Sequence, residues 1–105
     1  MRQFSFLSDK KKVEVFCQKN NLSYLGLFGS TARGDNRPDS DIDLLYEFDS
    51  PKSLFQLMNI KDEFEDLIGQ PVDLVSKRYI KPLVRPYIER DLITIYEKRP
   101  TYISE

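Results

Sequence analysis

Three acidic residues and one Gly-Ser pair are the parts of this sequence whose types and spacing suit chemistry. Asp41 and Asp43 are separated by one residue, and Asp73 lies in a later apolar run, Val72–Val75. Residues two apart on a strand point to the same face of a sheet, so the carboxylates of Asp41 and Asp43 are expected to converge. Such a pair suits Mg²⁺, which binds few carboxylates and leaves positions for water and phosphates.

Asp73 supplies a third carboxylate if its strand lies beside the strand of Asp43. An acid flanked by Val72, Leu74 and Val75 is costly to bury without a partner, which favours a functional role. Asp73 is then expected to ligate a metal and to take the proton from an attacking hydroxyl group. Two ions in such a site stabilise both the attacking and the leaving oxygen of an in-line displacement.

The Gly29-Ser30 pair follows an apolar run and precedes a short helix predicted over residues 30–34. The first N–H groups of a helix lack partners within it, and glycine lets a phosphate approach without a Cβ in the way. The turn therefore suits a triphosphate, although it lacks the Gly-x-x-x-x-Gly-Lys pattern of a P-loop. Arg33 follows closely enough to reach a phosphate oxygen or, equally, to pair with nearby acids.

Composition excludes several other kinds of site. The chain has no histidine, which removes Ser-His-Asp and Cys-His catalysis and histidine-bound zinc. Cys17 is the only cysteine, so no disulfide can form within the chain, and its spacing from Val13 predicts a core position. A calcium-binding loop from Asp39 fails, because Leu44 stands where an EF-hand requires glycine.

The charges divide along the chain, although the formal net charge is −1. The stretch 35–73 is strongly acidic and the stretch 77–99 is basic. The first suits cations and the second suits phosphates or an acidic partner, although most of these charges are expected to be solvated. The low net charge argues against direct nucleic-acid binding. No apolar run is long enough to span a bilayer and no secretion signal is recognisable, so we expect a cytoplasmic protein without membrane association.

One alternating series of strands and helices must position these residues. At 105 residues the chain fits one small α/β domain, residues 1–105, with no internal repeat or linker. Turn-forming residues fill the loop 35–40, and a last helix is expected from about Arg85, because Pro86 breaks any helix begun earlier. Short apolar or alternating runs predict strands at residues 24–28, 41–48, 72–75 and 92–96.

Two longer helices are predicted from helical apolar spacing and from capping residues. The first is capped by Ser8 and buries the face that carries Val13. The second is capped by Ser50 or Ser53 and ends at Gly69. Its apolar face is predicted to contain Leu54, Leu57, Met58, Phe64, Leu67 and Ile68.

Together these motifs resemble a known family. Gly-Ser-Thr-Ala-Arg-Gly-Asp at 29–35, followed by Ser-Asp-Ile-Asp-Leu-Leu at 40–45, resembles the polymerase-β-like nucleotidyltransferase superfamily and, within it, the minimal nucleotidyltransferase branch. Pro-Val-Asp-Leu-Val at 71–75 is similar to the segment that carries the third acid. The resemblance covers a motif core of about residues 24–96.

The resemblance implies a mixed sheet of three or four strands flanked by helices, with two Mg²⁺ ions and ATP as ligands. It implies that Asp41, Asp43 and Asp73 hold the metals and that Gly29 and Ser30 hold the triphosphate. Members of this branch are commonly antitoxins encoded beside a helical HEPN ribonuclease toxin, and some transfer AMP to a toxin tyrosine. By this resemblance, the chain is a Mg²⁺-dependent adenylyltransferase and antitoxin that modifies a hydroxyl group of its cognate HEPN toxin.

Two other functions stay open from the sequence. An antitoxin that blocks its toxin by docking alone would work equally well without the aspartates. A transferase for a small molecule or an RNA end is disfavoured, because such enzymes normally add a domain that shapes the acceptor site. Neither the base preference nor the acceptor residue is encoded in these motifs.

Overall fold

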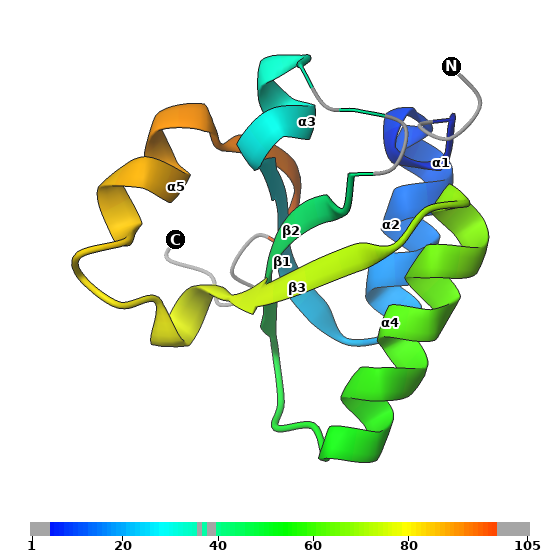
Figure 1. Cartoon of the computed structure of the whole chain (residues 1–105). Coiled ribbons are helices and arrows are strands. Elements are labelled where there is room, and N and C mark those ends of the chain that lie inside the picture. The colour runs from blue at the N-terminus through cyan, green and yellow to red at the C-terminus, as the bar shows by residue number, and fades with distance from the viewer. Residues whose placement is uncertain (1–4, 36, 38–39, 99–105) are drawn as a thin grey trace, which may run out of the picture.

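A computed structural model describes residues 5–35, 37 and 40–98 of the chain. Its centre is a four-stranded mixed sheet with the strand order β3-β2-β1-β4 (Figure 1). β1 is antiparallel to both β2 and β4, whereas β2 and β3 are parallel. This confirms the predicted mixed sheet, with every strand close to its predicted position. The strands are β1 (Leu22–Phe28), β2 (Ile42–Phe48), β3 (Val72–Ser76) and β4 (Ile93–Glu97).

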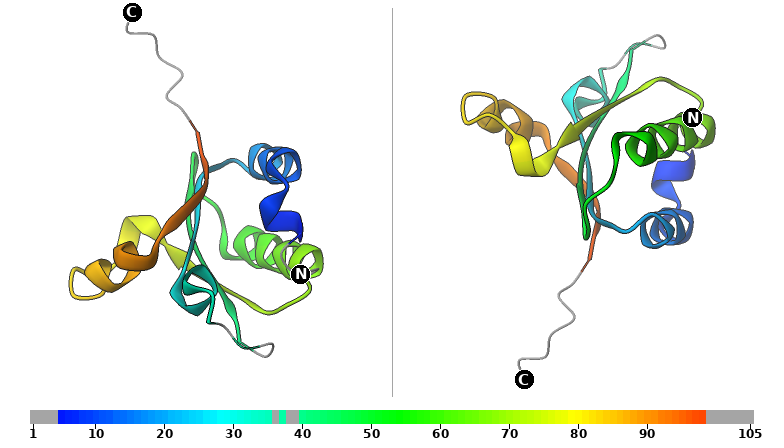
Figure 2. Two further views of the ribbon diagram at one scale, coloured as in Figure 1. Left: turned by 90° about the horizontal axis from the view of Figure 1, so that it is seen from above. Right: turned by 90° about the horizontal axis from the view of Figure 1, so that it is seen from below.

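The helices divide between the two faces of the sheet, as the views along it in Figure 2 show. One face is covered by α1 (Ser5–Ser8), α2 (Lys10–Lys19) and α4 (Leu54–Ile68). On the other face lie the short 3-10 turn η2 (Lys77–Tyr79) and α5 (Arg85–Asp91). No helix among the described residues is long and apolar enough to cross a membrane.

The remaining helix, α3 (Gly29–Arg33), continues directly from the end of β1 and contacts β2 and α5. It confirms the short helix predicted after the Gly-Ser pair, and it ends at Gly34 in the left-handed conformation. The predicted loop 35–40 follows. Within that loop, Asn36, Pro38 and Asp39 lie outside the described residues.

Side-chain caps determine where the two long helices begin. The predicted Ser8 cap is wrong, because Ser8 belongs to α1, while Asp9 has the extended backbone that a cap requires. The Asp9 carboxylate accepts a hydrogen bond from the backbone N–H of Lys12 at 3.1 Å. Ser53 is the cap of α4, one of the two serines predicted, and it exchanges hydrogen bonds of 3.1 and 2.8 Å with Gln56.

The main core lies between the sheet and the layer of α2 and α4. Phe64 of α4 and Cys17 of α2 are fully buried, and the ring of Phe16 meets that of Phe64 at 4.5 Å between centroids. Burial raises the pKa of the Cys17 thiol to about 12. This confirms the core position predicted for Cys17 and argues against a reactive thiolate.

The predicted apolar face of α4 is wrong in part. The buried residues are Ile60, Phe64 and Ile68, which form one narrow stripe at four-residue spacing. Leu54 and Met58 are 70% and 53% exposed, because the helical repeat places them to the side of this stripe. Most of the helix's contact with the core is therefore made by its C-terminal half.

This packing predicts unequal effects for two phenylalanines of the same helix. Phe64→Ala is expected to lower the free energy of unfolding by about 3–5 kcal/mol, because it removes a fully buried ring from the core. Phe55→Ala is the matched control, since that ring is 80% exposed, and its effect is expected within about 0.5 kcal/mol. Urea unfolding followed by circular dichroism measures both. Equal losses for the two variants would contradict this account of the core.

Candidate active site

The register of the sheet places Asp43 and Asp73 side by side. β2 and β3 are parallel neighbours, and Asp43 pairs with Asp73 in their ladder. Asp41 directly precedes β2 and is exposed. Ile42 and Leu44 point to the opposite face, where they are fully buried in the main core. The condition set for Asp73, that its strand lies beside the strand of Asp43, is therefore met.

The environment predicted for Asp73 is wrong. Asp73 is exposed, so the cost of burying an unpaired acid does not apply to it. Its neighbours Val72 and Leu74 pack against the main core on the other face of β3. Asp73 itself lies on the face that α5 covers only in part, and an open face leaves room for a ligand.

The surroundings of Asp43 shift the pKa of its carboxyl group. Partial burial raises its pKa, and the negative charges of Asp73 and then Asp41 raise it further. The guanidinium of Arg33 acts in the opposite direction. Asp73 and Asp41 thus repel the charge of the Asp43 carboxylate, and a bound cation would relieve this repulsion.

The donor set fits a hard divalent cation, although the ligands are not preassembled. Among residues 5–35, 37 and 40–98, no three acids are gathered closely enough to enclose a metal ion. Asp41 and Asp73 are exposed, whereas Asp43 is half-buried. Binding of a metal ion therefore requires Asp41 and Asp73 to turn toward Asp43. Exposed side chains change rotamer at small cost. Carboxylate oxygens are the ligands that Mg²⁺ prefers.

Gly29 brings the turn before α3 against this group of acids. It has a φ of 74°, a left-handed conformation that favours glycine. A Cβ at this position would collide with the carboxylate of Asp43, its nearest neighbour. The start of α3, with Ser30 as its next residue, therefore adjoins Asp43, and glycine is required for this approach.

Arg33 makes the ion pairs that were one of its two predicted roles. Its Nη1 donates to Asp91 at 2.9 Å and its Nε donates to Asp35 at 3.3 Å. The hydrogen bond with Asp91, followed by that with Asp35, raises the pKa of the guanidinium. A guanidinium carries more N–H donors than these two pairs use, so a phosphate contact stays open.

Three supporting residues were not predicted from the sequence. Gln70, 9% exposed, donates from Nε2 to the backbone carbonyl of Ser40 at 3.1 Å and so holds the approach to Asp41. Glu65 on α4 accepts a hydrogen bond from the N–H of Val72 at 2.9 Å and so holds the start of β3. Asp91 anchors Arg33. A polar residue beside a turn or at a helix end is usually exposed, so the sequence contains no signal for these contacts.

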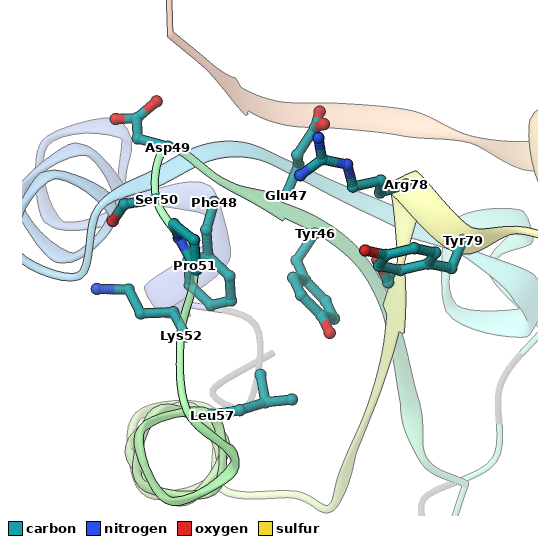
Figure 3. A pocket seen from close by; sticks show the side chains of 11 residues that line it. Tyr46, Glu47, Phe48, Asp49, Ser50, Pro51, Lys52, Leu57, Arg78 and Tyr79 are labelled. Atoms are coloured by element: carbon teal, nitrogen blue, oxygen red, sulfur yellow. The ribbon is translucent and has the colours of Figure 1, made fainter.

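A cavity of about 310 Å³ lies at the C-terminal end of β2, away from Asp43 (Figure 3). Its walls come from the last residues of β2, the segment that follows and η2, with Tyr46, Phe48 and Tyr79 among them. Asp43 stands near the start of β2 and does not line this cavity. The acids and the Gly-Ser turn instead lie on the open surface of the sheet.

The comparison with known families agrees with this arrangement. Residues 10–101 match the family model described as polymerase beta, nucleotidyltransferase. The chain belongs to the polymerase β nucleotidyltransferase family. Membership places it among enzymes that transfer a nucleotide, and the matched region contains the acids, the glycine turn and all four strands.

Relatives within this family are named for one activity. A Methanocaldococcus jannaschii protein, provisionally named protein adenylyltransferase MJ1217, is 37% identical over 87 residues, which are 82% of this chain and 89% of the relative. Protein adenylyltransferase MntA of Thermococcus cleftensis is 34% identical over 71 residues, 68% of this chain and 72% of the relative.

Solved structures share the fold. One described provisionally as a minimal nucleotidyltransferase superposes with a TM-score of 0.72 at 33% identity, covering 89% of this chain and 95% of that chain. A chain of the complex of a tri-AMPylated Shewanella oneidensis HEPN toxin with its MNT antitoxin gives a TM-score of 0.63. Its identity is 17%, and the match covers 93% of this chain and 74% of that chain. At that identity the likeness concerns the fold alone.

Gly29 offers a direct test of the site geometry. Gly29→Ala is expected to lower nucleotidyl transfer by about 100-fold, because the added methyl group displaces the Asp43 carboxylate. Gly69→Ala is the matched control, since Gly69 also has a positive φ, of 84°, but open space around its Cβ position. Both variants are expected to lose about 1 kcal/mol of unfolding free energy from backbone strain. Transfer rates that fall equally in both variants would refute the role assigned to Gly29.

The raised pKa of Asp43 makes a second prediction. At pH values between the ordinary and the raised pKa, the folded state still holds a proton on Asp43 that the unfolded chain has released. The contribution of this group to stability therefore falls as the pH rises through the raised pKa. Asp43→Asn is therefore expected to be at least as stable as the wild type at neutral pH. This advantage should disappear below the ordinary carboxyl pKa. Urea unfolding at several pH values measures it, with exposed Asp62→Asn as the control, and matching pH profiles for wild type and Asp43→Asn would contradict it.

Proposed function

We propose that this chain is a Mg²⁺-dependent protein adenylyltransferase that acts as an antitoxin by transferring AMP from ATP to a toxin hydroxyl group. The observation that carries the proposal is the meeting of Gly29 with Asp43, at the point where Asp73 lies in register on the next strand. A glycine turn at a helix start and converging carboxylates are the two parts that a metal-bound triphosphate needs. The names of the relatives supply the base and the class of acceptor.

The glycine turn holds the triphosphate in this proposal. The backbone N–H groups at the start of α3 donate to phosphate oxygens, and the absent Cβ of Gly29 lets the phosphates approach the acids. The Ser30 hydroxyl adds a donor at the same turn. Arg33 turns its remaining N–H donors to a phosphate oxygen while Asp91 keeps it in place.

Asp41, Asp43 and Asp73 hold Mg²⁺, as two ions in the full site, with Asp43 as the fixed ligand. When bound, these ions neutralise the phosphates and stabilise charge on the attacking and leaving oxygens. Asp73 is more exposed than Asp43, with which it pairs in the sheet, and it accepts the proton of the acceptor hydroxyl group. The acceptor oxygen then bonds to the α-phosphorus, the bond from that phosphorus to the bridging oxygen breaks, and pyrophosphate leaves.

The acceptor in this proposal is a tyrosine of a HEPN-type ribonuclease encoded beside this chain, and the reaction takes place in the cytoplasm. The AMPylated HEPN toxin bound to an MNT antitoxin, a structure of the same fold, supports this pairing. So do the relatives named protein adenylyltransferases. The open surface around Asp43 and Asp73 fits an acceptor as large as a folded protein.

Label transfer tests the catalytic proposal. With a HEPN-type partner and Mg²⁺, α-labelled ATP is expected to label the partner, whereas γ-labelled ATP is not, because its label leaves with pyrophosphate. EDTA is expected to abolish transfer. The double variant Asp41→Ala/Asp43→Ala is expected to lose at least about 100-fold in rate, because it removes two of the three metal ligands. Asp62→Ala/Asp66→Ala, two exposed acids of α4, is the control with the same change of charge.

The same variants separate the alternatives. Normal transfer by Asp41→Ala/Asp43→Ala would refute the catalytic site. If that variant transferred no AMP yet neutralised the toxin in cells as well as the wild type, the chain would be an antitoxin that works by binding alone. Transfer to an RNA end or a small hydroxyl compound in preference to the protein would move the acceptor to another class.

A further inference from the structure

The segment between β3 and β4 carries an exposed apolar surface. Figure 2 shows η2 and α5 projecting from the sheet on the side away from α2 and α4. Leu83 is 87% exposed, Tyr87 67% and Val84 44%. Apolar side chains grouped on a surface typically mark an interaction site. We call six of the exposed side chains of this segment the arm surface: Lys81, Leu83, Val84, Arg85, Tyr87 and Arg90.

The arm surface is basic, although the chain as a whole is slightly acidic. It carries three bases, Lys81, Arg85 and Arg90, beside one exposed acid, Glu89. Arg85 reaches Glu89 only at 3.5 Å, and the guanidinium of Arg90 lies 6.0 Å from the centre of the Tyr87 ring. Cations alternate here with apolar side chains, which suits a partner surface that is both acidic and apolar.

The inner side of the arm is anchored to the sheet and to the candidate active site. Ile88, 5% exposed, packs in a small core with Tyr24 and Leu45. Asp91, the last residue of α5, holds Arg33 of α3 at 2.9 Å. The arm surface is therefore the outward side of a fixed element that adjoins the Gly-Ser turn.

The charges on and around the arm surface favour one kind of binding partner. A second copy of this chain, related by a two-fold axis through the arm, would bring like charges together. RNA or an anionic membrane that extended from the arm across α3 would meet the carboxylate beyond it, that of Asp43, and would be repelled. A folded protein with a local acidic and apolar segment avoids both conflicts, because it can present an uncharged hydroxyl group to the acids.

We propose that the arm surface docks an acidic segment of the protein acceptor and so brings the acceptor hydroxyl group to the acids on the neighbouring sheet. This inference rests on the proposed function for the identity of the occupant. The docking itself is measured without catalysis, which keeps the two separable.

A defined acidic polymer tests the docking. The probe is a random copolymer of glutamate and tyrosine, with a lysine–tyrosine copolymer as the comparison. Wild-type protein is expected to bind the acidic copolymer selectively, and Lys81→Glu/Leu83→Asp to bind it at least about tenfold more weakly. Lys61→Glu/Phe55→Asp makes the same change of charge and polarity on exposed positions of α4 and is expected to bind normally. Binding of ATP with Mg²⁺ is expected to be the same in all three proteins.

Several outcomes would overturn the docking proposal. These are unchanged copolymer binding by Lys81→Glu/Leu83→Asp, equal weakening by the α4 control, and tighter binding of a single-stranded RNA or of phosphatidylserine vesicles than of the copolymer. If the wild type bound the copolymer through the arm but transferred AMP to no protein, the docking surface would stand and the proposed function would fail.

Discussion

The contact between the backbone of Gly29 and the carboxylate of Asp43 is the constraint on which the rest of the arrangement depends. It requires a residue without a Cβ, in a left-handed conformation, at the end of β1. It also requires β1 and β2 to be antiparallel with Phe28 opposite Asp43, so that the turn meets the acid. The parallel pairing of β2 with β3 then adds Asp73 at the same end of the sheet. Segments far apart in the sequence thus meet at one point through backbone hydrogen bonds.

The two faces of β2 have different physical roles. Ile42 and Leu44 are fully buried against the α2 and α4 layer, whereas Asp43 faces the partly open side. Stability therefore comes from one face, and the carboxylates lie on the other. The raised pKa of Asp43 shows the energetic cost, since partial burial and two like charges disfavour its ionised form. A site that binds a cation accepts this repulsion in the free protein, because the ion relieves it.

Local patterns predicted more of the molecule than long-range contacts did. The strand around Asp43 and the glycine turn are visible because alternation and backbone conformation depend on neighbouring residues. The Ser8 cap failed because Asp9, equally suited by type, is the residue with the extended backbone. The burial of Asp73 was misjudged because apolar neighbours in a strand describe one face only. Gln70 was missed because its partner, Ser40, lies 30 residues away and no pattern links them.

Arg33 shows how such a distant contact changes the interpretation of a motif residue. From the sequence, a phosphate contact and an ion pair are competing roles for its guanidinium. In the structure, Asp91, 58 residues away and with only 13% of its side chain exposed, holds one end of that group. Asp35 is bound more loosely, at 3.3 Å, and 63% of its side chain is exposed. A phosphate can therefore displace Asp35 at small cost while Asp91 keeps Arg33 oriented, because a pair exposed to that extent contributes little. In the proposed function, the ion pair with Asp91 therefore orients Arg33 for a phosphate, and it links α3 to α5.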